Sequence, residues 1–235
     1  MKRRILLIAC AMLVLLSTGL SAKTLVVFYS YTGDCRDIVT VLTSQIEADV
    51  LEIQPADKGQ RYEANGYALG TSLLNAIKAN PNDAASYPAI DPVTTSLNGY
   101  GTVIIVTPLW WSQMAAIMQS YLFRYGSQMA GKNVGLIVSS SSSNIGGVVN
   151  DCKRLVPSGK YFSQNLWIND GNRSRRNTLI QDWLAAIDYD QTTGIQSLRA
   201  ATPDARAYDV AGRPLQKEAP KGTVYIKDGK KRLTK

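Results

Sequence analysis

The sequence contains no histidine, and it has only three cysteines among its 235 residues. Without histidine, Ser-His-Asp and Cys-His catalysis are excluded, and a zinc site is disfavoured. The three cysteines are too few for a disulfide framework. One of them, Cys10, lies in the apolar N-terminal segment, which leaves Cys35 and Cys152 for the rest of the chain. No metal site and no side-chain acid, base or nucleophile is predicted.

Net charge is nearly absent from the middle of the chain, although the formal total is +8. Residues 2–4 carry three basic side chains, and residues 199–235 carry a net charge of +6. A nucleic-acid-binding domain needs a basic face interleaved with aromatic residues. The middle of the chain offers only Arg173, Arg175 and Arg176, which are typical of a solvated helix face. We therefore expect no nucleic-acid partner.

The N-terminus has the pattern of a secretory signal peptide. A basic head is followed by an apolar run from Ile5 to Leu16 and by small residues as far as Ala22. The apolar run is too short for a permanent membrane span. We expect cleavage near Ala22 and export to the periplasm, the cell surface or the medium.

Between residues 23 and 190, short apolar runs alternate with amphipathic segments, which predicts an α/β domain with a mostly parallel sheet. The expected strands are 25–28, 50–53, 103–106, 134–138 and 166–168. The expected helices are 39–46, 69–79, 112–124, 146–155 and 177–187. The turn-rich segment 80–98 is expected to run over the surface.

The segment from Thr24 to Cys35 is the most informative part of the domain. Its apolar strand passes directly into a turn that contains Ser30, Thr32 and Gly33, and a helix follows. Such a turn directs hydroxyls and backbone N–H groups toward a phosphate at the positive end of a helix. An ordinary capped strand–helix turn has similar residues, so this segment alone leaves both interpretations open.

Two further strands end in distinctive loops. Residues 107–112 read TPLWWS, and residues 139–147 read SSSSSNIGG. The loops after parallel strands lie at the carboxyl edge of the sheet, where ligands bind. One loop therefore suits a phosphate, one offers an aromatic pair, and one offers hydroxyls. A heteroaromatic ring that carries a phosphate would match all three.

These three motifs, in this order, resemble those of flavodoxin-like proteins over residues 24–190. The resemblance implies a doubly wound, five-stranded parallel sheet of order 2-1-3-4-5 with flavin mononucleotide (FMN) at the switch between strands one and three. Residues of the first loop would hold the phosphate, the aromatic loop would flank the ring, and the serine loop would contact its polar edge. The residues implied are Ser30, Thr32, Gly33, Asp34 and Cys35; Pro108, Trp110 and Trp111; and Ser140, Ser141, Asn144 and Gly146.

The phosphate loop departs from the family pattern at two positions. Asp34 stands where the family has Asn, and Cys35 stands where it has Thr. A carboxylate beside a phosphate repels it, although Arg36 could offset this charge by turning inward. Alternatively, Asp34 is the N-cap of its own helix. A helix N-terminus predicts a lowered pKa for the Cys35 thiol; alternatively, this small residue simply fills the turn. Cys152 is expected to be buried.

Trp110 and Trp111 are expected to divide two roles, one packing in the core and the other stacking on a ligand. The serine loop has no aromatic residue, so these loops would cover only one face of a flavin. An open face suits exchange with a flat partner such as a quinone.

The sequence changes character near residue 207, after an expected linker at 191–206. Short β-prone runs at 207–210 and 224–226 alternate with turn signals. This tail resembles the C-terminal sorting signal of type IX secretion, and the resemblance implies contact with secretion machinery. Alternatively, the tail is a partly disordered basic segment or a hairpin that docks on the core.

Two functions remain open at this point. The first is an exported protein that binds FMN and carries electrons, or reduces a small acceptor such as a quinone, with an unidentified redox donor. The second is a flavodoxin-like fold that has lost FMN and acts as a binding or structural module outside the cell.

Overall fold

The computed structural model describes residues 23–60, 68–190, 208–209, 224–227 and 230–233. The predicted signal peptide, the linker and the turn signals of the tail lie outside these residues. None of the helices described is long and apolar enough to cross a membrane.

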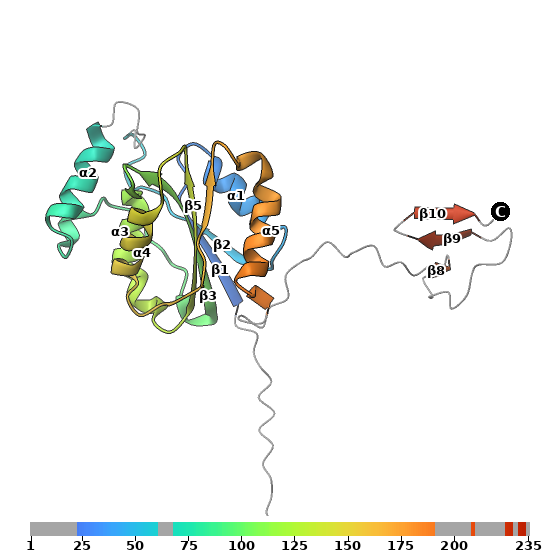
Figure 1. The fold of residues 1–235 in the computed structure, drawn as a ribbon. Coiled ribbons are helices and arrows are strands. Elements are labelled where there is room, and N and C mark those ends of the chain that lie inside the picture. Colours follow the sequence, from blue (N-terminus) through green and yellow to red (C-terminus); the bar gives the residue numbers. More distant parts are fainter. Residues whose placement is uncertain (1–22, 61–67, 191–207, 210–223, 228–229, 234–235) are drawn as a thin grey trace, which may run out of the picture.

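The described residues between 23 and 190 form one mostly parallel sheet between two layers of helices (Figure 1). The strands are β1 (Lys23–Phe28), β2 (Asp49–Glu52), β3 (Tyr100–Trp110), β4 (Gln113–Met114), β5 (Asn133–Ser140), β6 (Lys160–Tyr161) and β7 (Leu166–Asn169). The α-helices are α1 (Asp34–Thr43), α2 (Ala68–Ala79), α3 (Ala116–Tyr125), α4 (Gly146–Leu155) and α5 (Arg176–Ala186). Four 3-10 helices are η1 (Ala84–Ser86), η2 (Leu97–Gly99), η3 (Gly126–Met129) and η4 (Arg173–Arg175).

The predicted strand order is confirmed. The sheet runs β2-β1-β3-β5, and the fifth place is shared by two short strands, because β6 pairs with the start of β5 and β7 with its end. All these pairings are parallel. β4 adds a short antiparallel pairing to β3.

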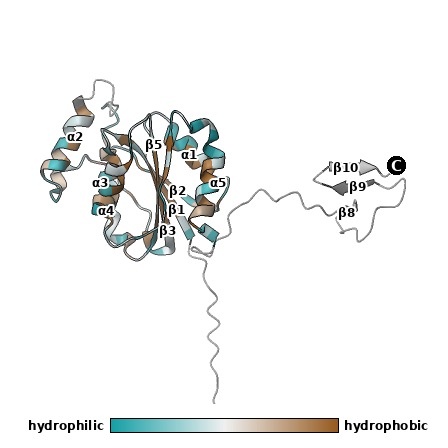
Figure 2. Cartoon of the chain, in the orientation of Figure 1, coloured by the Kyte–Doolittle hydropathy of each residue, from teal (hydrophilic) through white to brown (hydrophobic). Residues whose placement is uncertain are grey.

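Alternating side chains divide the core into two clusters, one on each face of the sheet. Val27 and Ile105 face the cluster that contains α3 and α4, whereas Val26 and Ile104 face the cluster that contains α1 and α5. Figure 2 shows apolar residues along the central strands and polar residues on the outer helix surfaces. Burial of both strand faces explains the continuous apolar run of β3.

Two expectations about the elements are wrong. The helix predicted from Ser112 begins at Ala116, because Trp110 to Met114 first form a tight hairpin between β3 and β4. The segment 80–98 does not simply run over the surface, since its Tyr87, Ile90 and Leu97 are buried in the core. The Tyr87 ring stacks on Phe123 with 4.1 Å between the ring centroids.

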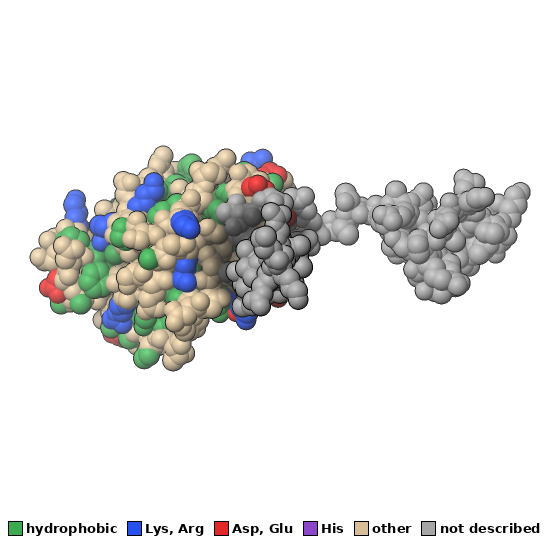
Figure 3. All heavy atoms as spheres, turned by 90° about the horizontal axis from the view of Figure 1, so that it is seen from below, with side chains coloured by type: hydrophobic (Ala, Val, Ile, Leu, Met, Phe, Trp, Pro, Cys, Tyr) green, Lys and Arg blue, Asp and Glu red, His purple; other side chains and the backbone are tan. Residues whose placement is uncertain are grey.

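The tail contains a separate antiparallel sheet of three strands, β8 (Tyr208–Asp209), β9 (Val224–Lys227) and β10 (Lys230–Leu233). β8 and β9 confirm the two β-prone runs, and β10 was not predicted. Figure 3 shows the face of the domain at the amino end of β1, where Lys and Arg side chains are scattered singly.

Candidate functional site

The three distinctive loops follow β1, β3 and β5, which are neighbouring parallel strands, so they meet at one edge of the sheet. Tyr29 of the first loop packs edge-on against Trp110 of the second, with ring centroids 5.8 Å apart. Gly147, at the start of α4, lies so close to the Ser112 carbonyl oxygen that an added Cβ would approach it to 1.9 Å. The predicted loops therefore form one continuous surface.

The first loop ends at the N-terminus of α1, where Gly33 and Asp34 are half-buried. Gly33 is the N-cap of α1 with φ 101°, a left-handed conformation that glycine adopts without strain. The first intrahelical hydrogen bond runs from the Asp37 N–H to the Gly33 carbonyl oxygen. The N–H groups of Asp34 and Cys35 therefore precede the helical ladder and point out of its positive end. This is the donor arrangement that favours a phosphate.

Ser30 and Thr32 also contribute hydroxyls to this loop. The Arg36 N–H donates to Ser30 Oγ over 3.3 Å, so Ser30 stabilises the first turn of α1 from outside the helix. Thr32 Oγ1 donates to Asp34 Oδ2 over 2.8 Å. The loop is therefore held by its own side chains in the form that presents its N–H groups.

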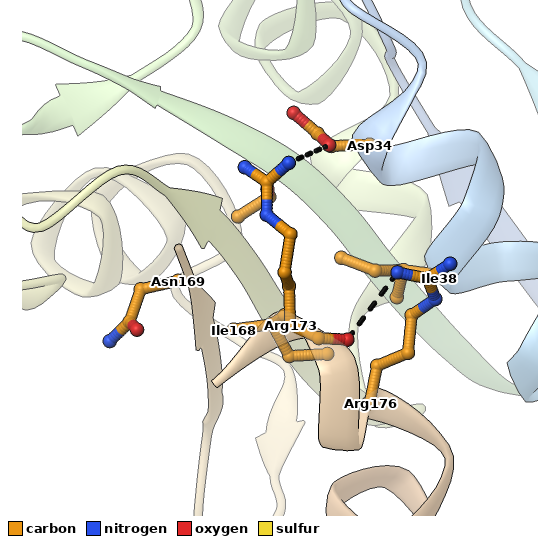
Figure 4. Close-up of a pocket in the computed structure, with 7 residues that line it drawn as sticks. Asp34, Ile38, Ile168, Asn169, Arg173 and Arg176 are labelled. Atoms are coloured by element: carbon orange, nitrogen blue, oxygen red, sulfur yellow. Dashed lines mark hydrogen bonds and ion pairs between the residues drawn. The ribbon is translucent and has the colours of Figure 1, made fainter. Parts of the chain in front are cut away.

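Asp34 is not the N-cap, because Gly33 takes that place, and so the capping alternative is wrong. The Asp34 carboxylate instead turns toward the loop after β7, where its Oδ1 lies 3.2 Å from Arg173 Nη1 (Figure 4). The expectation that Arg36 offsets this carboxylate is also wrong, because Arg36 pairs with Glu52. The charge of Asp34 is thus compensated by a residue about 140 positions away in the sequence.

The arginine cluster at 173–176 is not simply a solvated face. Arg176 Nη2 lies 3.4 Å from Asp37 Oδ2, which gives a second ion pair between the first turn of α1 and the start of α5. Both arginines line a small cavity with Asp34, Ile38, Ser139, Ile168 and Asn169. The sequence did not predict these two ion pairs. A signal was present, because Asp34 and Asp37 have the same spacing of three residues as Arg173 and Arg176.

Cys35 is packed inside the protein. The whole residue is 1% exposed, and its side chain lies in the cluster between the sheet and α1 and α5. Burial raises the pKa of this thiol far above its ordinary value, and Asp34 raises it further. The prediction of a lowered pKa is therefore wrong, and the alternative of a small residue that fills the turn is confirmed. The Cys35 side chain is therefore no part of the phosphate site.

The two tryptophans differ sharply in exposure. Trp110 is 6% exposed and belongs to the core, whereas Trp111 is 52% exposed. Trp111 and Ser112 have φ of 50° and 61° and form the two-residue turn between β3 and β4. Positive φ at two successive residues is the pattern of a type I′ hairpin turn, which normally contains Gly or Asn. A strained turn thus presents Trp111 at the edge of the sheet.

The serine loop is held by internal hydrogen bonds. Ser140 Oγ accepts from Trp167 Nε1 over 2.8 Å and donates to the Ser143 carbonyl oxygen over 3.2 Å. Asn144 Oδ1 accepts from the Gly146 N–H over 2.7 Å. The exposed side chains of Ser141 and Asn144 remain at the rim. Pro108 lies half-buried near the end of β3, beside Ser139 of β5.

The family of the chain follows from its sequence as well as from its fold. The sequence profile of the flavodoxins matches residues 23–187, which include the whole sheet. This chain belongs to the flavodoxin family. No curated protein sequence is significantly similar to it.

Solved structures share the flavodoxin fold of residues 23–190. A candidate flavoprotein from Bacteroides uniformis has a TM-score of 0.55 and 23% identity, covering 68% of this chain and 98% of that chain. Another from Bacteroides eggerthii has a TM-score of 0.54 and 24% identity, covering 71% and 98%. A flavoprotein from Lactobacillus acidophilus, solved in complex with FMN, has a TM-score of 0.52 and 19% identity, covering 66% and 97%. At these identities the likeness shows the fold.

Proposed function

We propose that this flavodoxin-family protein binds FMN across its three loops and works as an electron carrier or as a reductase of a small acceptor such as a quinone. The observation that carries the proposal is the meeting of a phosphate-type helix N-terminus with an exposed tryptophan at one sheet edge. The FMN bound by the Lactobacillus acidophilus flavoprotein supports the same ligand class.

The residues present fit FMN at both ends. The N–H groups at the start of α1 can donate to phosphate oxygens, and the Thr32 hydroxyl can do so when it leaves the Asp34 carboxylate. Trp111 offers a ring for stacking, and Pro108 lies in the same loop. The Ser140 hydroxyl and the Gly146 N–H already have protein partners. We therefore expect exposed polar groups of residues 141–144 to form most of the hydrogen bonds to the polar edge of the flavin.

Bound FMN would supply the redox chemistry, and the protein would supply binding, orientation and electrostatics. Trp111 would cover part of the ring and exclude water there. The buried Trp110 would support the turn from below through its contact with Tyr29. No side chain is needed as an acid, base or nucleophile.

The rival function, a flavodoxin-like module without FMN, rests on Asp34 and Cys35. Arg173 compensates the Asp34 charge, and Cys35 leaves its backbone N–H at the helix terminus. The ion pair with Arg173 therefore answers the objection that the Asp34 charge raises against FMN.

The test is a fluorescence titration of the purified, flavin-free protein with FMN and with riboflavin. We expect saturable quenching by FMN at micromolar protein and clearly weaker binding of riboflavin, which lacks the phosphate. An absorbance spectrum of the protein as isolated gives an independent readout. If micromolar protein produces no saturable change with FMN, the FMN-free module becomes the better interpretation.

We further propose that the protein is exported and that residues 207–235 direct its sorting. The basic and apolar N-terminal pattern and the resemblance of the tail to a type IX signal support this proposal. Fractionation of the native cells, followed by mass spectrometry of the N-terminus, tests both export and cleavage near Ala22.

A further inference from the structure

We infer that Arg173 is a positioning residue that allows the phosphate loop to accept a phosphorylated flavin despite Asp34. This inference rests on the proposed FMN function and concerns one part of that site. Arg173 pairs with the carboxylate that lies beside the N–H donors of α1, and it does so from the turn that precedes α5. Arg173 therefore determines selectivity for flavin phosphates over flavins without a phosphate.

The geometry places Arg173 between two acidic partners. Its Nη1 lies 3.2 Å from Asp34 Oδ1, and its Nη2 pairs with Asp170. Figure 4 shows its side chain reaching from the start of η4 toward the first turn of α1. Arg176 supports this arrangement, because its Nη1 donates to the Arg173 carbonyl oxygen and its Nη2 pairs with Asp37. The arginine is therefore held at the phosphate loop by contacts at both ends.

Asp34 also binds one of the hydrogen-bond donors of the loop, the Thr32 hydroxyl. Its Oδ2 accepts the hydrogen bond from Thr32 Oγ1, while its Oδ1 faces Arg173. A phosphate at the loop would compete with Asp34 for the Thr32 hydroxyl. Arg173 still pairs with the Asp34 carboxylate after the hydroxyl leaves, so the carboxylate is not left without a partner. Loss of Arg173 would leave an uncompensated carboxylate that both repels the phosphate and retains Thr32.

The charge balance explains why this single residue matters. The first turn of α1 carries two carboxylates, Asp34 and Asp37, at the end where the helix dipole favours a phosphate. Arg173 pairs with Asp34 and also with Asp170, and Arg176 pairs with Asp37. Arg36, which also lies in the first turn of α1, is paired with Glu52 instead. Substitution of Arg173 therefore removes the ion-pair partner of Asp34 at the phosphate site and that of Asp170 beside it.

The experiment compares four variants with the wild type: Arg173→Gln, Asp34→Asn, the double variant, and Arg175→Gln as the control. Arg175 lies on the same 3-10 turn and is exposed, so its substitution removes the same charge. Each protein is titrated with FMN and with riboflavin at low and at high salt. Thermal melting verifies that each variant is folded.

We expect Arg173→Gln to weaken FMN binding about three- to tenfold at low salt, and less at high salt, with riboflavin unchanged. Asp34→Asn should tighten FMN binding, and in the double variant it should restore affinity to near the wild-type value. Arg175→Gln should stay within about twofold of the wild type. Equal effects of Arg173→Gln and Arg175→Gln, or an equal loss of riboflavin binding, would overturn the inference. Absence of FMN binding by the wild type would overturn the proposed function, and the inference with it.

Discussion

Each loop of the site has a buried layer and an exposed rim, and different interactions hold the residues of the two parts in place. Cys35, Trp110 and Ser139 form the buried layer, and they lie beside the exposed or half-exposed Asp34, Trp111 and Ser141. The buried residues are fixed by packing. The rim residues are held by ion pairs, a strained turn and local hydrogen bonds. The buried layer should therefore determine stability, and the rim should determine ligand binding.

The largest expected effect separates the two tryptophans. Trp110→Ala removes a core side chain and should lower the free energy of unfolding by about 3–5 kcal/mol. Trp111→Ala should change it by less than about 0.5 kcal/mol but weaken FMN binding by ~0.5–1.5 kcal/mol. Thermal melting and flavin titration measure the two effects. If both variants lose stability and FMN affinity to the same extent, the buried layer and the exposed rim do not have separate roles at this loop.

A smaller effect is expected where the aromatic and serine loops meet. A Cβ at Gly147 would approach the Ser112 carbonyl oxygen to 1.9 Å, so the backbone must move. Gly147→Ala should cost about 1–3 kcal/mol of stability, the usual range for overpacking. The matched control is Gly146→Ala, whose Cβ would meet only Asn144 Oδ1 at 3.1 Å. Equal melting temperatures for the two variants would show that the contact between the loops is loose.

Most of the buried layer could be predicted from the sequence, because apolar periodicity reports burial directly. The five sheet positions, their order and the burial of Cys152 all followed from such patterns or from the family motifs. Part of the rim could not be predicted. The pairing of Asp34 with Arg173 depends on where the loop after β7 lies relative to α1. Helix propensity also failed at Ser112, because the hairpin to β4 overrides it.

The buried thiol gives a pH-dependent test of the same comparison. The pKa of Cys35 is raised above its ordinary value of 9.0 by burial, so the folded protein keeps the proton that the unfolded chain loses. This contribution is fully present below pH 9 and is lost as the pH rises further, by up to ~1.4 kcal/mol per pH unit.

The free energy of unfolding of Cys35→Ala should therefore fall less steeply between pH 9 and 10.5 than that of the wild type. Denaturant unfolding at several pH values measures the two slopes. Other groups with raised pKa values, such as Tyr161, are the same in both proteins and cancel. Parallel slopes would mean that the Cys35 thiol titrates alike in the folded and unfolded states.

The smallest effect is expected for a segment that belongs to neither layer. The tail strands β8, β9 and β10 pair only with one another among the described strands, and the sheet of residues 23–190 is complete without them. A truncation after Ile195 should melt within a few degrees of the mature protein and keep its FMN affinity. The same truncation should leave the protein in the periplasm if the tail is a sorting signal. A truncated protein that unfolds would instead show that the tail stabilises the domain. The sorting proposal assumes that the domain folds without the tail, so it would then lose its support.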